Sequence, residues 1–490
     1  MIDAETSYQA VSSRDARFDG VFYTAVRTTG IYCRPSCPAT TPKRQNVHFY
    51  PSAAAAQGAG FRACRRCRPD TSPGSPEWNV RADLVGRAMR MIGDGVVDRE
   101  GVTGLAARLG YSERHLTREL VAELGAGPQA LARSQRAHTA RLLLQTTELS
   151  ATDTAFAAGF ASVRQFNDTM RQVYGLTPTE LRRKPTRSAA AAVPPGAIAL
   201  RLAHRGPLAA GQLFDFLALR AVPGVEEVTT TGRVRSYRRT LALPGGPGIA
   251  EVDQPRGQQG RLDCRLTLTS LRDLTCAVQR IRALFDLDSD PDAVDRRLGA
   301  DPVLAPLVAA RPGLRSPGHV DPHELAVRAV LGQQVTVAAA RTLAGRLAAR
   351  YGEPLPVPSG GLTRLFPTAA ALAEADSADL AMPGARQRAL RGLCAALADG
   401  SVDLAPGVDR EQAAASLLAL PGIGPWTVSY VRMRALADPD AYLPTDIGVR
   451  HGLRAAGATA AVDDSAWRPW RSYAVHHLWA ALNSQEAKQN

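Results

Sequence analysis

The sequence is poor in three features, and each absence narrows the class of protein. It has no run of about 18 apolar residues, which excludes a membrane-spanning helix. Its start, MIDAETSYQA, lacks the apolar core of a signal peptide, so we expect a cytoplasmic chain whose thiols stay reduced. It is also short of acidic residues relative to basic ones. With 490 residues, the chain is long enough for three or four domains.

The basic excess is uneven along the chain. The formal net charge is +13 and the pI is about 9.8. Residues 1–187 carry +9 of this charge and the remainder +4. Most of the basic residues are arginine, whose planar fork suits phosphate groups. Nucleic acid is therefore a candidate partner, although such a charge can also serve only solubility.

Four of the seven cysteines form two tight pairs in the first 70 residues. Cys33 and Cys37 make one pair, and Cys64 and Cys67 make the other. The remaining three stand alone: Cys264, Cys276 and Cys394. Two short-spaced pairs in a reduced chain predict one tetrahedral Zn²⁺ site, with two disulfides or unrelated buried cysteines as alternatives. On spacing alone, such a site is more typical of a structural zinc ribbon than of a reactive centre.

A repeated pattern follows the cysteine pairs. Residues 106–112 (AARLGYS) are echoed by residues 155–162 (AFAAGFAS). Each predicts an alanine-bearing helix, a glycine turn, and a serine that caps the next helix, with Leu116 and Phe166 facing inward. The pattern predicts two helix-turn-helix units joined by a helix over residues 136–144. Their groove-facing candidates are Arg114 and His115 in the first unit and Arg164 and Gln165 in the second.

Residues 80–184 resemble the AraC-type DNA-binding domain, including the ending YGLTP at 174–178. The cysteine-bearing segment resembles the N-terminal domain of Ada alkylation-response proteins through TTGIYCRPSCP (28–38), NVHF (46–49) and GAGFRACRRC (58–67). This resemblance implies that all four paired cysteines bind zinc and that Cys33 accepts a methyl group from a DNA methylphosphotriester. It also implies DNA contacts by Arg34, Arg65 and Arg66. Thr40 departs from the arginine of many relatives.

A glycine-rich turn marks the C-terminal part. LPGIGPWT (420–427) lies between helical runs at 412–420 and 426–436, so Gly422 and Gly424 predict a helix-hairpin-helix that grips DNA phosphate. An ordinary interhelical loop is the alternative. About twenty residues later, Asp446 follows a proline turn at a helix start, where a carboxylate often serves only as a cap.

Together with WRPWRSYA (467–474), these motifs resemble the AlkA-type class II 3-methyladenine DNA glycosylases over about residues 195–479. The resemblance implies that Asp446 is the catalytic carboxylate and that Trp426, Trp479 and Tyr442 line the base pocket, with core packing as the alternative for the tryptophans. Trp426 stands where bifunctional relatives carry lysine, which predicts a monofunctional enzyme. Gln334 stands where some relatives carry a leucine wedge.

The sequence therefore predicts a multidomain, mainly α chain. The predicted order is a small α+β zinc domain (1–75), a double helix-turn-helix bundle (78–186), an AlkA-type α+β domain (195–310) and a helical helix-hairpin-helix core (311–488). The expected function is alkylation repair joined to a methylphosphotriester-sensing regulator. The alternative is a transcription regulator with structural zinc and a non-catalytic C-terminal domain. The cysteine motif of O6-alkylguanine transferases is absent, so that activity is not expected.

The resemblance also leads to expectations about bound ions, binding partners and cellular location. Besides one Zn²⁺, the resemblance implies a monovalent cation at the helix-hairpin-helix. The expected partners are double-stranded alkylated and promoter DNA, and RNA polymerase. We expect a monomer that associates with the nucleoid and not with a membrane.

Overall fold

The computed structural model describes residues 3–69, 84–182, 196–257, 260–458 and 462–489. The predicted domain boundaries at residues 75, 78, 186 and 195 lie outside these ranges. The described chain divides into two compact units, which are treated separately. Unit 1 comprises residues 1–205, 243–246 and 265–279, and unit 2 comprises residues 206–242, 247–264 and 280–490.

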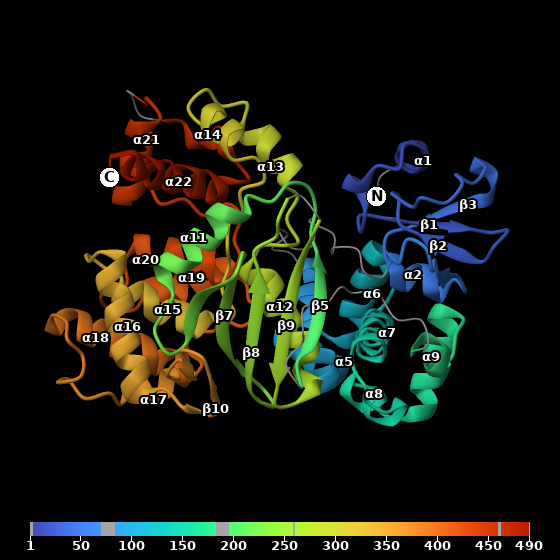
Figure 1. The fold of residues 1–490 in the computed structure, drawn as a ribbon, viewed down its shortest axis with the longest axis horizontal. Coiled ribbons are helices and arrows are strands. Elements are labelled where there is room, and N and C mark those ends of the chain that lie inside the picture. The colour runs from blue at the N-terminus through green and yellow to red at the C-terminus, as the bar shows by residue number, and fades with distance from the viewer. Residues whose placement is uncertain (1–2, 70–83, 183–195, 258–259, 459–461, 490) are drawn as a thin grey trace. The chain divides into compact units, whose positions relative to one another are not determined.

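Unit 1 begins with a small α+β segment built on a four-stranded sheet of order β3-β1-β2-β4. Strand β1 pairs antiparallel with β2 and β3, whereas β2 and β4 run parallel. The elements of this segment, drawn in blue in Figure 1, are α1 (Ala4–Ser12), η1 (Ala16–Phe18), β1 (Tyr23–Val26), β2 (Ile31–Cys33), η2 (Arg44–Asn46), β3 (Val47–Tyr50), α2 (Ala53–Gly58) and β4 (Arg62–Ala63).

The rest of unit 1 up to residue 182 is helical. Its helices are α4 (Leu84–Gly93), α5 (Val96–Leu109), α6 (Glu113–Leu124), α7 (Pro128–Thr146), α8 (Ala151–Ala157), α9 (Val163–Tyr174) and α10 (Pro178–Arg182). The two predicted helix-turn-helix units are confirmed as α5–α6 and α8–α9. In each, the turn glycine has a positive φ, +79° at Gly110 and +85° at Gly159, a conformation that a side chain would strain.

Local signals explain why the repeated sequence folds this way. Ser112 accepts a hydrogen bond from the backbone N–H of His115, and Ser162 accepts one from that of Gln165. Each serine thus satisfies a donor that a helix start leaves free. Leu116 and Phe166 are fully buried, as predicted from their inner-face positions. The predicted connecting helix is α7.

A five-stranded sheet of order β5-β9-β8-β7-β6 follows in the chain. Strands β7 and β6 pair antiparallel in continuous register from Glu226↔Arg239 to Thr231↔Val234. The elements of this region are β5 (Ile198–Ala203), α11 (Ala210–Arg220), β6 (Glu226–Thr231), β7 (Val234–Leu243), β8 (Gly246–Asp253), β9 (Arg261–Leu268), η4 (Leu271–Asp273), α12 (Leu274–Leu284), α13 (Pro291–Leu298) and α14 (Ala305–Ala310).

The remainder of unit 2 is helical except for one short strand pair. Its elements are α15 (Pro322–Leu331), α16 (Val337–Tyr351), β10 (Pro354–Ser359), β11 (Leu362–Arg364), α17 (Ala369–Ala373), α18 (Gly384–Ala398), α19 (Arg410–Leu418), α20 (Pro425–Arg434), α21 (Ile447–Ala455), η5 (Asp464–Trp467) and α22 (Arg471–Gln489). No helix among the described residues is long and apolar enough to cross a membrane.

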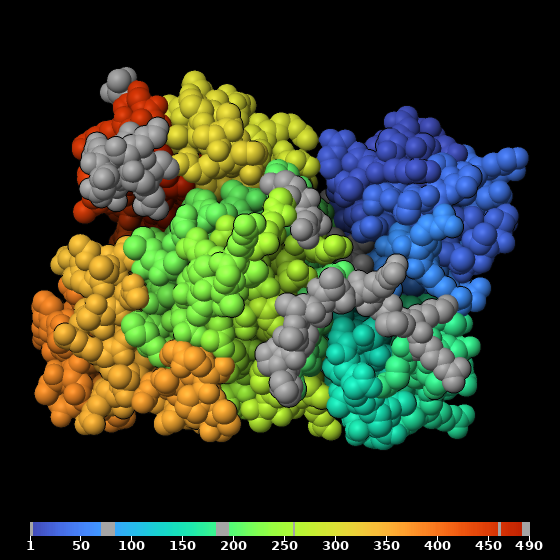
Figure 2. Space-filling model, viewed as in Figure 1, coloured from blue at the N-terminus to red at the C-terminus, as the bar shows by residue number. Residues whose placement is uncertain are grey.

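Two apolar clusters organise these helices. One contains buried residues of α15 to α20, such as Leu331, Leu390 and Val431. The other joins α13 and α14 to the C-terminal α22, with Trp467 fully buried at its centre. Figure 2 shows the surface of α13 and α14 in yellow adjoining the red C-terminal segment. The position of α20 and α22 relative to α11 sets the geometry of the site described next.

Candidate functional site

A cavity of about 1170 Å³ opens in unit 2. Its wall is formed by α11, α15 with the loop that follows it, α16, the turn before α20, α20 itself, the start of α21 with the residues just before it, and α22. Its aromatic lining is Phe216, Trp426, Tyr430 and Trp479, and Asp446 is the one carboxylate among the lining residues. A concave aromatic wall with a few polar groups is typical of a ligand site.

Asp446 is the residue that joins this wall together. The indole N–H of Trp426 donates a 2.9 Å hydrogen bond to Asp446 Oδ2, and that of Trp479 donates one of 2.9 Å to Oδ1. Asp446 Oδ1 also accepts from the backbone N–H of Val449, which makes Asp446 the N-cap of α21. The sequence offered capping and catalysis as alternatives, but the geometry gives the cap and a fixed position in the cavity to the same carboxylate.

The aromatic rings are held by one another. Trp426 stacks on Tyr430 with ring centroids 5.3 Å apart and 12° between the planes. Trp479 stacks on Phe216 at 6.4 Å and 17°. His476 meets both Phe216 and Trp479 edge-on, and burial holds the pKa of its imidazole well below the usual value. Neutral His476 thus packs behind the cavity as an apolar ring would.

Gly448 keeps Trp479 close to Asp446. A Cβ at this position would lie 2.9 Å from Trp479 Cδ1 and 3.0 Å from Asp446 Oδ1. Either contact is too short for a carbon, so a side chain here would separate the indole from the carboxylate.

If the cavity carries out the base release that the resemblance implies, we expect Trp479→Phe to slow it about 10-fold, because the ring remains but one charge-assisted hydrogen bond to Asp446 is lost. Single-turnover kinetics on lesion-bearing duplex measure this change. Trp470→Phe is the matched control, since Trp470 packs on Tyr473 and does not line the cavity. Equal rates for both variants would contradict a role for the indole N–H.

The predicted hairpin borders the same cavity. Gly422 and Gly424 line it and lie between α19 and α20. Gly422 has φ +83°, and a Cβ there would lie 2.6 Å from Ala389 Cβ, so only glycine lets the turn seat against α18. Gly424 is the N-cap of α20, and no heavy atom lies within 4 Å of its Cβ position. This open helix start suits a phosphate group.

Gln334 and Tyr442 have different surroundings. Gln334 lines the cavity, is exposed, and has the unusual φ of +57°. The side chain of its neighbour Gln333 donates to Gly422 O and Thr427 Oγ1, which fixes the loop to the hairpin. Tyr442 is not among the cavity-lining residues, because its ring packs edge-on against Trp467 at 5.6 Å. The structure therefore does not bring Tyr442 to the base pocket in which the resemblance put it.

The cysteine pairs form a second site, in unit 1. Cys33 ends β2, while Cys64 and Cys67 follow β4, the parallel neighbour of β2. Parallel pairing puts both strand ends at one edge, and the four sulfur atoms lie within 4.8 Å of one another. Tetrahedral zinc requires sulfurs about 3.8 Å apart, given a Zn–S bond of about 2.3 Å. The four cysteines thus fit one Zn²⁺.

The four cysteine residues differ in exposure. Cys64 and Cys67 are buried, whereas Cys33 and Cys37 are half-buried. Asp19 fixes the turn between the accessible pair: its carboxylate accepts from Ser36 N–H and Oγ–H and lies 3.3 Å from Arg34 Nη1. Burial raises the pKa of Asp19, while these hydrogen bonds and Arg34 oppose the rise.

The predicted DNA-contact residues of unit 1 are dispersed over three elements. Arg65 and Arg66 are exposed beside the cysteines, and Arg65 Nη2 donates to Gly175 O over 3.4 Å. On α6, Arg114 is exposed and His115 stacks on Tyr111. On α9, Arg164 is exposed, and Gln165 accepts from the backbone N–H of Ala161.

Sequence reasoning did not single out Phe216, Arg220 or Tyr430. Phe216 and Arg220 lie on α11, more than 200 residues before Tyr430 and Trp426 in sequence order, and only folding brings the two stretches together. The period of α20 offered one signal, because Tyr430 is four residues after Trp426 and therefore shares its helix face.

Family models match four segments of the chain in the predicted order. They are the metal binding domain of Ada (6–70), a helix-turn-helix domain (105–184), the AlkA N-terminal domain (199–321) and the HhH-GPD superfamily base excision DNA repair protein (327–466). The predicted fold class, with its helical core, AlkA-type domain and stranded zinc domain, is confirmed.

Three relatives illustrate the same division. The chain is 54% identical to the probable bifunctional transcriptional activator/DNA repair enzyme AlkA of Mycobacterium tuberculosis, over 98% of this chain and 97% of that protein. It is 37% identical to DNA-3-methyladenine glycosylase 2 of Escherichia coli, over 54% of this chain and 92% of that one. It is 36% identical to the bifunctional transcriptional activator/DNA repair enzyme Ada of E. coli, over 36% of this chain and 48% of that protein.

The match to the M. tuberculosis protein covers nearly the whole of both chains and confirms the family resemblance inferred from the motifs. The chain belongs to the family of AlkA-type bifunctional transcriptional activator/DNA repair enzymes.

Proposed function

We propose that this chain is a DNA glycosylase for alkylated purines such as 3-methyladenine, fused to a DNA-binding regulator that senses methylphosphotriesters. The observation that carries the glycosylase is the Asp446 carboxylate held by the N–H groups of Trp426 and Trp479 in an aromatic cavity beside the Gly422–Gly424 hairpin. A duplex gripped at the hairpin can present one flipped nucleotide to that cavity.

The chemistry follows from where the charges lie. Alkylation at N3 or N7 makes the purine a cation, which stacks well on electron-rich indole and phenol rings. The C1′–N bond breaks, its electron pair goes to the base, and positive charge develops on the sugar. The Asp446 carboxylate stabilises this charge. Water then adds its oxygen to C1′ and releases a proton, which leaves an abasic site.

The test of this proposal is release of free base. Wild-type protein incubated with methylated duplex DNA is expected to release 3-methyladenine, detected by chromatography. Because Trp426 replaces the lysine that would form a Schiff base, the DNA strand should stay intact until it is heated in alkali. Normal DNA binding without base release would instead support the non-catalytic regulator. Strand cleavage by the protein itself would contradict the monofunctional assignment.

The regulatory half rests on a different observation, the half-buried Cys33 within a four-cysteine cluster that fits zinc. A Zn²⁺ ion held by Cys33, Cys37, Cys64 and Cys67 would keep their thiols deprotonated, and the four thiolates with the ion would carry a formal charge of −2. This charge disfavours ionised phosphates, whereas a methylphosphotriester is neutral. Cys33 Sγ bonds to the methyl carbon, the C–O bond breaks, and the phosphate oxygen keeps the electron pair. The cluster charge falls to −1, which favours DNA binding by the neighbouring arginines.

Intact-mass and peptide mass spectrometry test the methyl transfer. After incubation with methylphosphotriester DNA, we expect one added methyl group on Cys33 and no turnover beyond one per chain. Cys37→Ser would lose a zinc ligand, so Cys394→Ser, on a lone cysteine buried in α18, is the better control and should still accept one methyl. An unmodified Cys33, or a methyl on Cys37, would end the assignment of Cys33 as acceptor.

Several finer points belong to the same proposal. Arg114, His115, Arg164 and Gln165 would contact promoter DNA from α6 and α9, and Arg34, Arg65 and Arg66 would contact phosphates near Cys33. Gln334 would fill the gap left by the flipped nucleotide. RNA polymerase as partner, a monomeric state, nucleoid association and a monovalent cation at the hairpin stay predictions, as do the four domain boundaries.

A further inference from the structure

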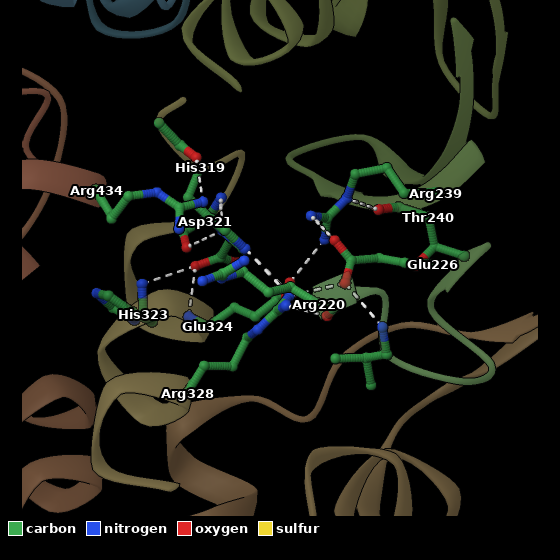
Figure 3. Close-up of polar contacts among 12 residues, drawn as sticks. Arg220, Glu226, Arg239, Thr240, His319, Asp321, His323, Glu324, Arg328 and Arg434 are labelled. Carbon is green, nitrogen blue, oxygen red and sulfur yellow. Dashed lines mark hydrogen bonds and ion pairs between the residues drawn. The ribbon is translucent and has the colours of Figure 1, made fainter. Parts of the chain in front are cut away.

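A cluster of buried charged side chains, drawn in Figure 3, reaches the cavity wall at Arg328. Glu226 lies 3.1 Å from Arg239 and 2.8 Å from Arg328, while Glu324 lies 2.7 Å from Arg239 and 2.9 Å from Arg328. Two carboxylates therefore meet two guanidiniums. His319 is also in contact, but burial lowers its pKa, so it adds no charge near neutral pH. The two negative and two positive charges of this cluster therefore sum to zero.

Two more arginines adjoin this balanced cluster without joining its ion pairs. Arg434 donates to the backbone oxygens of Pro317 and Gly318 and, over 3.2 Å, to the hydroxyl of Tyr430. Arg220 donates to Phe216 O. Within the described residues, neither arginine forms an ion pair with a carboxylate. Arg328 holds this end of α11 through a 2.6 Å hydrogen bond from Nη2 to Arg220 O.

Both unpaired guanidiniums lie against the rings of the cavity wall. The Cζ of Arg220 is 3.8 Å and that of Arg434 is 4.7 Å from the centroid of Phe216. Burial lowers the pKa of Arg220 to about 10, so the side chain still carries its charge near pH 7. Burial raises the pKa of the Tyr430 phenol, but Arg434, Arg220 and Arg328 together bring it below the usual value.

Arg434 is buried, and Arg220 is half-buried in the cavity wall. Holding these two cations largely out of water without a carboxylate partner is costly, so this arrangement needs a reason. Arg220 lines the cavity, as does Asp446. A flipped nucleotide with its sugar at Asp446 and its base on the aromatic wall has a carboxylate at one end of the glycosidic bond. We propose that Arg220, supported from behind by Arg434, is a catalytic residue at the other end, which stabilises the leaving base while Asp446 stabilises the sugar.

This inference rests on the proposed glycosylase activity and adds a charge argument to it. When the C1′–N bond breaks, the base gains the bonding electron pair. A cationic base becomes neutral, so its repulsion by Arg220 disappears in the transition state. A neutral base becomes an anion, which Arg220 attracts, before it takes up a proton from water. In both cases the interaction with Arg220 improves as the bond breaks, which is the condition for catalysis.

The two kinds of base give Arg220→Gln a distinctive signature. With hypoxanthine, a neutral base, we expect single-turnover release to fall about 100-fold. With 7-methylguanine, a cationic base, release should fall only about 10-fold, while binding of the lesion duplex becomes tighter because the repulsion is gone. Arg220→Lys keeps the charge and should retain most of the hypoxanthine activity. A residue with a merely structural role would not separate the two bases.

The measurements are single-turnover rates and equilibrium binding of duplexes that differ only in the lesion. Arg350→Gln, on α16, removes a 70% exposed arginine that pairs with Asp379 and does not line the cavity; it should match the wild type. Equal losses on both bases with unchanged binding, or full hypoxanthine activity in Arg220→Gln, would overturn the inference. So would a wild type that releases 7-methylguanine but no hypoxanthine. A wild type that releases neither base would instead refute the glycosylase proposal itself.

Discussion

Asp446→Asn is expected to slow release of 3-methyladenine about 10³-fold, the largest catalytic loss of any single substitution in the chain. The amide is neutral, so it cannot stabilise the positive charge that develops on the sugar. Its oxygen can still accept one indole N–H, but its NH₂ group cannot accept the other. Single-turnover release from methylated duplex measures the effect.

The variant should nevertheless fold and bind DNA. Asparagine caps helix starts about as well as aspartate, so the hydrogen bond from Val449 that begins α21 can be kept. Asp399→Asn, at the exposed end of α18, is a matched control that should retain wild-type activity. If Asp446→Asn released base at a rate within a few-fold of the wild type, Asp446 would be a cap and nothing more.

Cys64→Ala is expected to abolish zinc binding and unfold the N-terminal segment, which gives the largest stability effect in the protein. Cys64 is buried and follows the two-residue strand β4, and the apolar cluster around Phe22 in this segment is small. Binding of structural zinc contributes about 10–16 kcal/mol in small metal-dependent domains, far more than such a cluster can replace. Zinc content by elemental analysis and amide hydrogen exchange measure the two losses.

A chelator should have the same effect on the wild type, and added Zn²⁺ should reverse it. Cys394→Ala removes another buried thiol, in α18, and should leave zinc content unchanged. Base release should survive Cys64→Ala, because the cavity-lining residues all lie in unit 2. Retention of one zinc per chain by Cys64→Ala would show that the metal does not need this ligand.

The sequence predicted those features whose causes are local. The turn glycines Gly110 and Gly159, with their capping serines, act within a few residues, so the two helix-turn-helix units could be placed to the residue. The zinc site and the hairpin turn were predictable for similar reasons. The spacing of the cysteine pairs indicates the first, and the backbone freedom of Gly422 indicates the second. The family resemblance supplied Asp446, and the fold added its partners: Trp426 and Trp479 are 20 and 33 residues away, and no spacing rule reports that both donate to one carboxylate.

The features of the site that the sequence did not predict depend on packing between distant segments. Tyr442 was expected in the base pocket, but its ring packs on Trp467, twenty-five residues later, and is not among the residues that line the cavity. The sequence offered no reason to assign Phe216 and Arg220 to the site, because their neighbours Tyr430 and Arg434 come from a helix about 210 residues later. A pattern of residue types carries no information about which aromatic rings around one apolar cluster will line the cavity.

The balanced charge cluster also decides how the protein can be dissected. Glu226 and Arg239 come from strands in the segment matched as the AlkA N-terminal domain, whereas Glu324 and Arg328 come from α15, at the start of the HhH-GPD segment. A truncation near residue 321 would break the Arg239–Glu324 and Arg328–Glu226 ion pairs and leave each fragment with half of the buried cluster, at a cost of about 3–5 kcal/mol for each broken pair. The smallest fragment of the repair half that folds alone must therefore carry both segments, and a shorter one should be recovered only as aggregate.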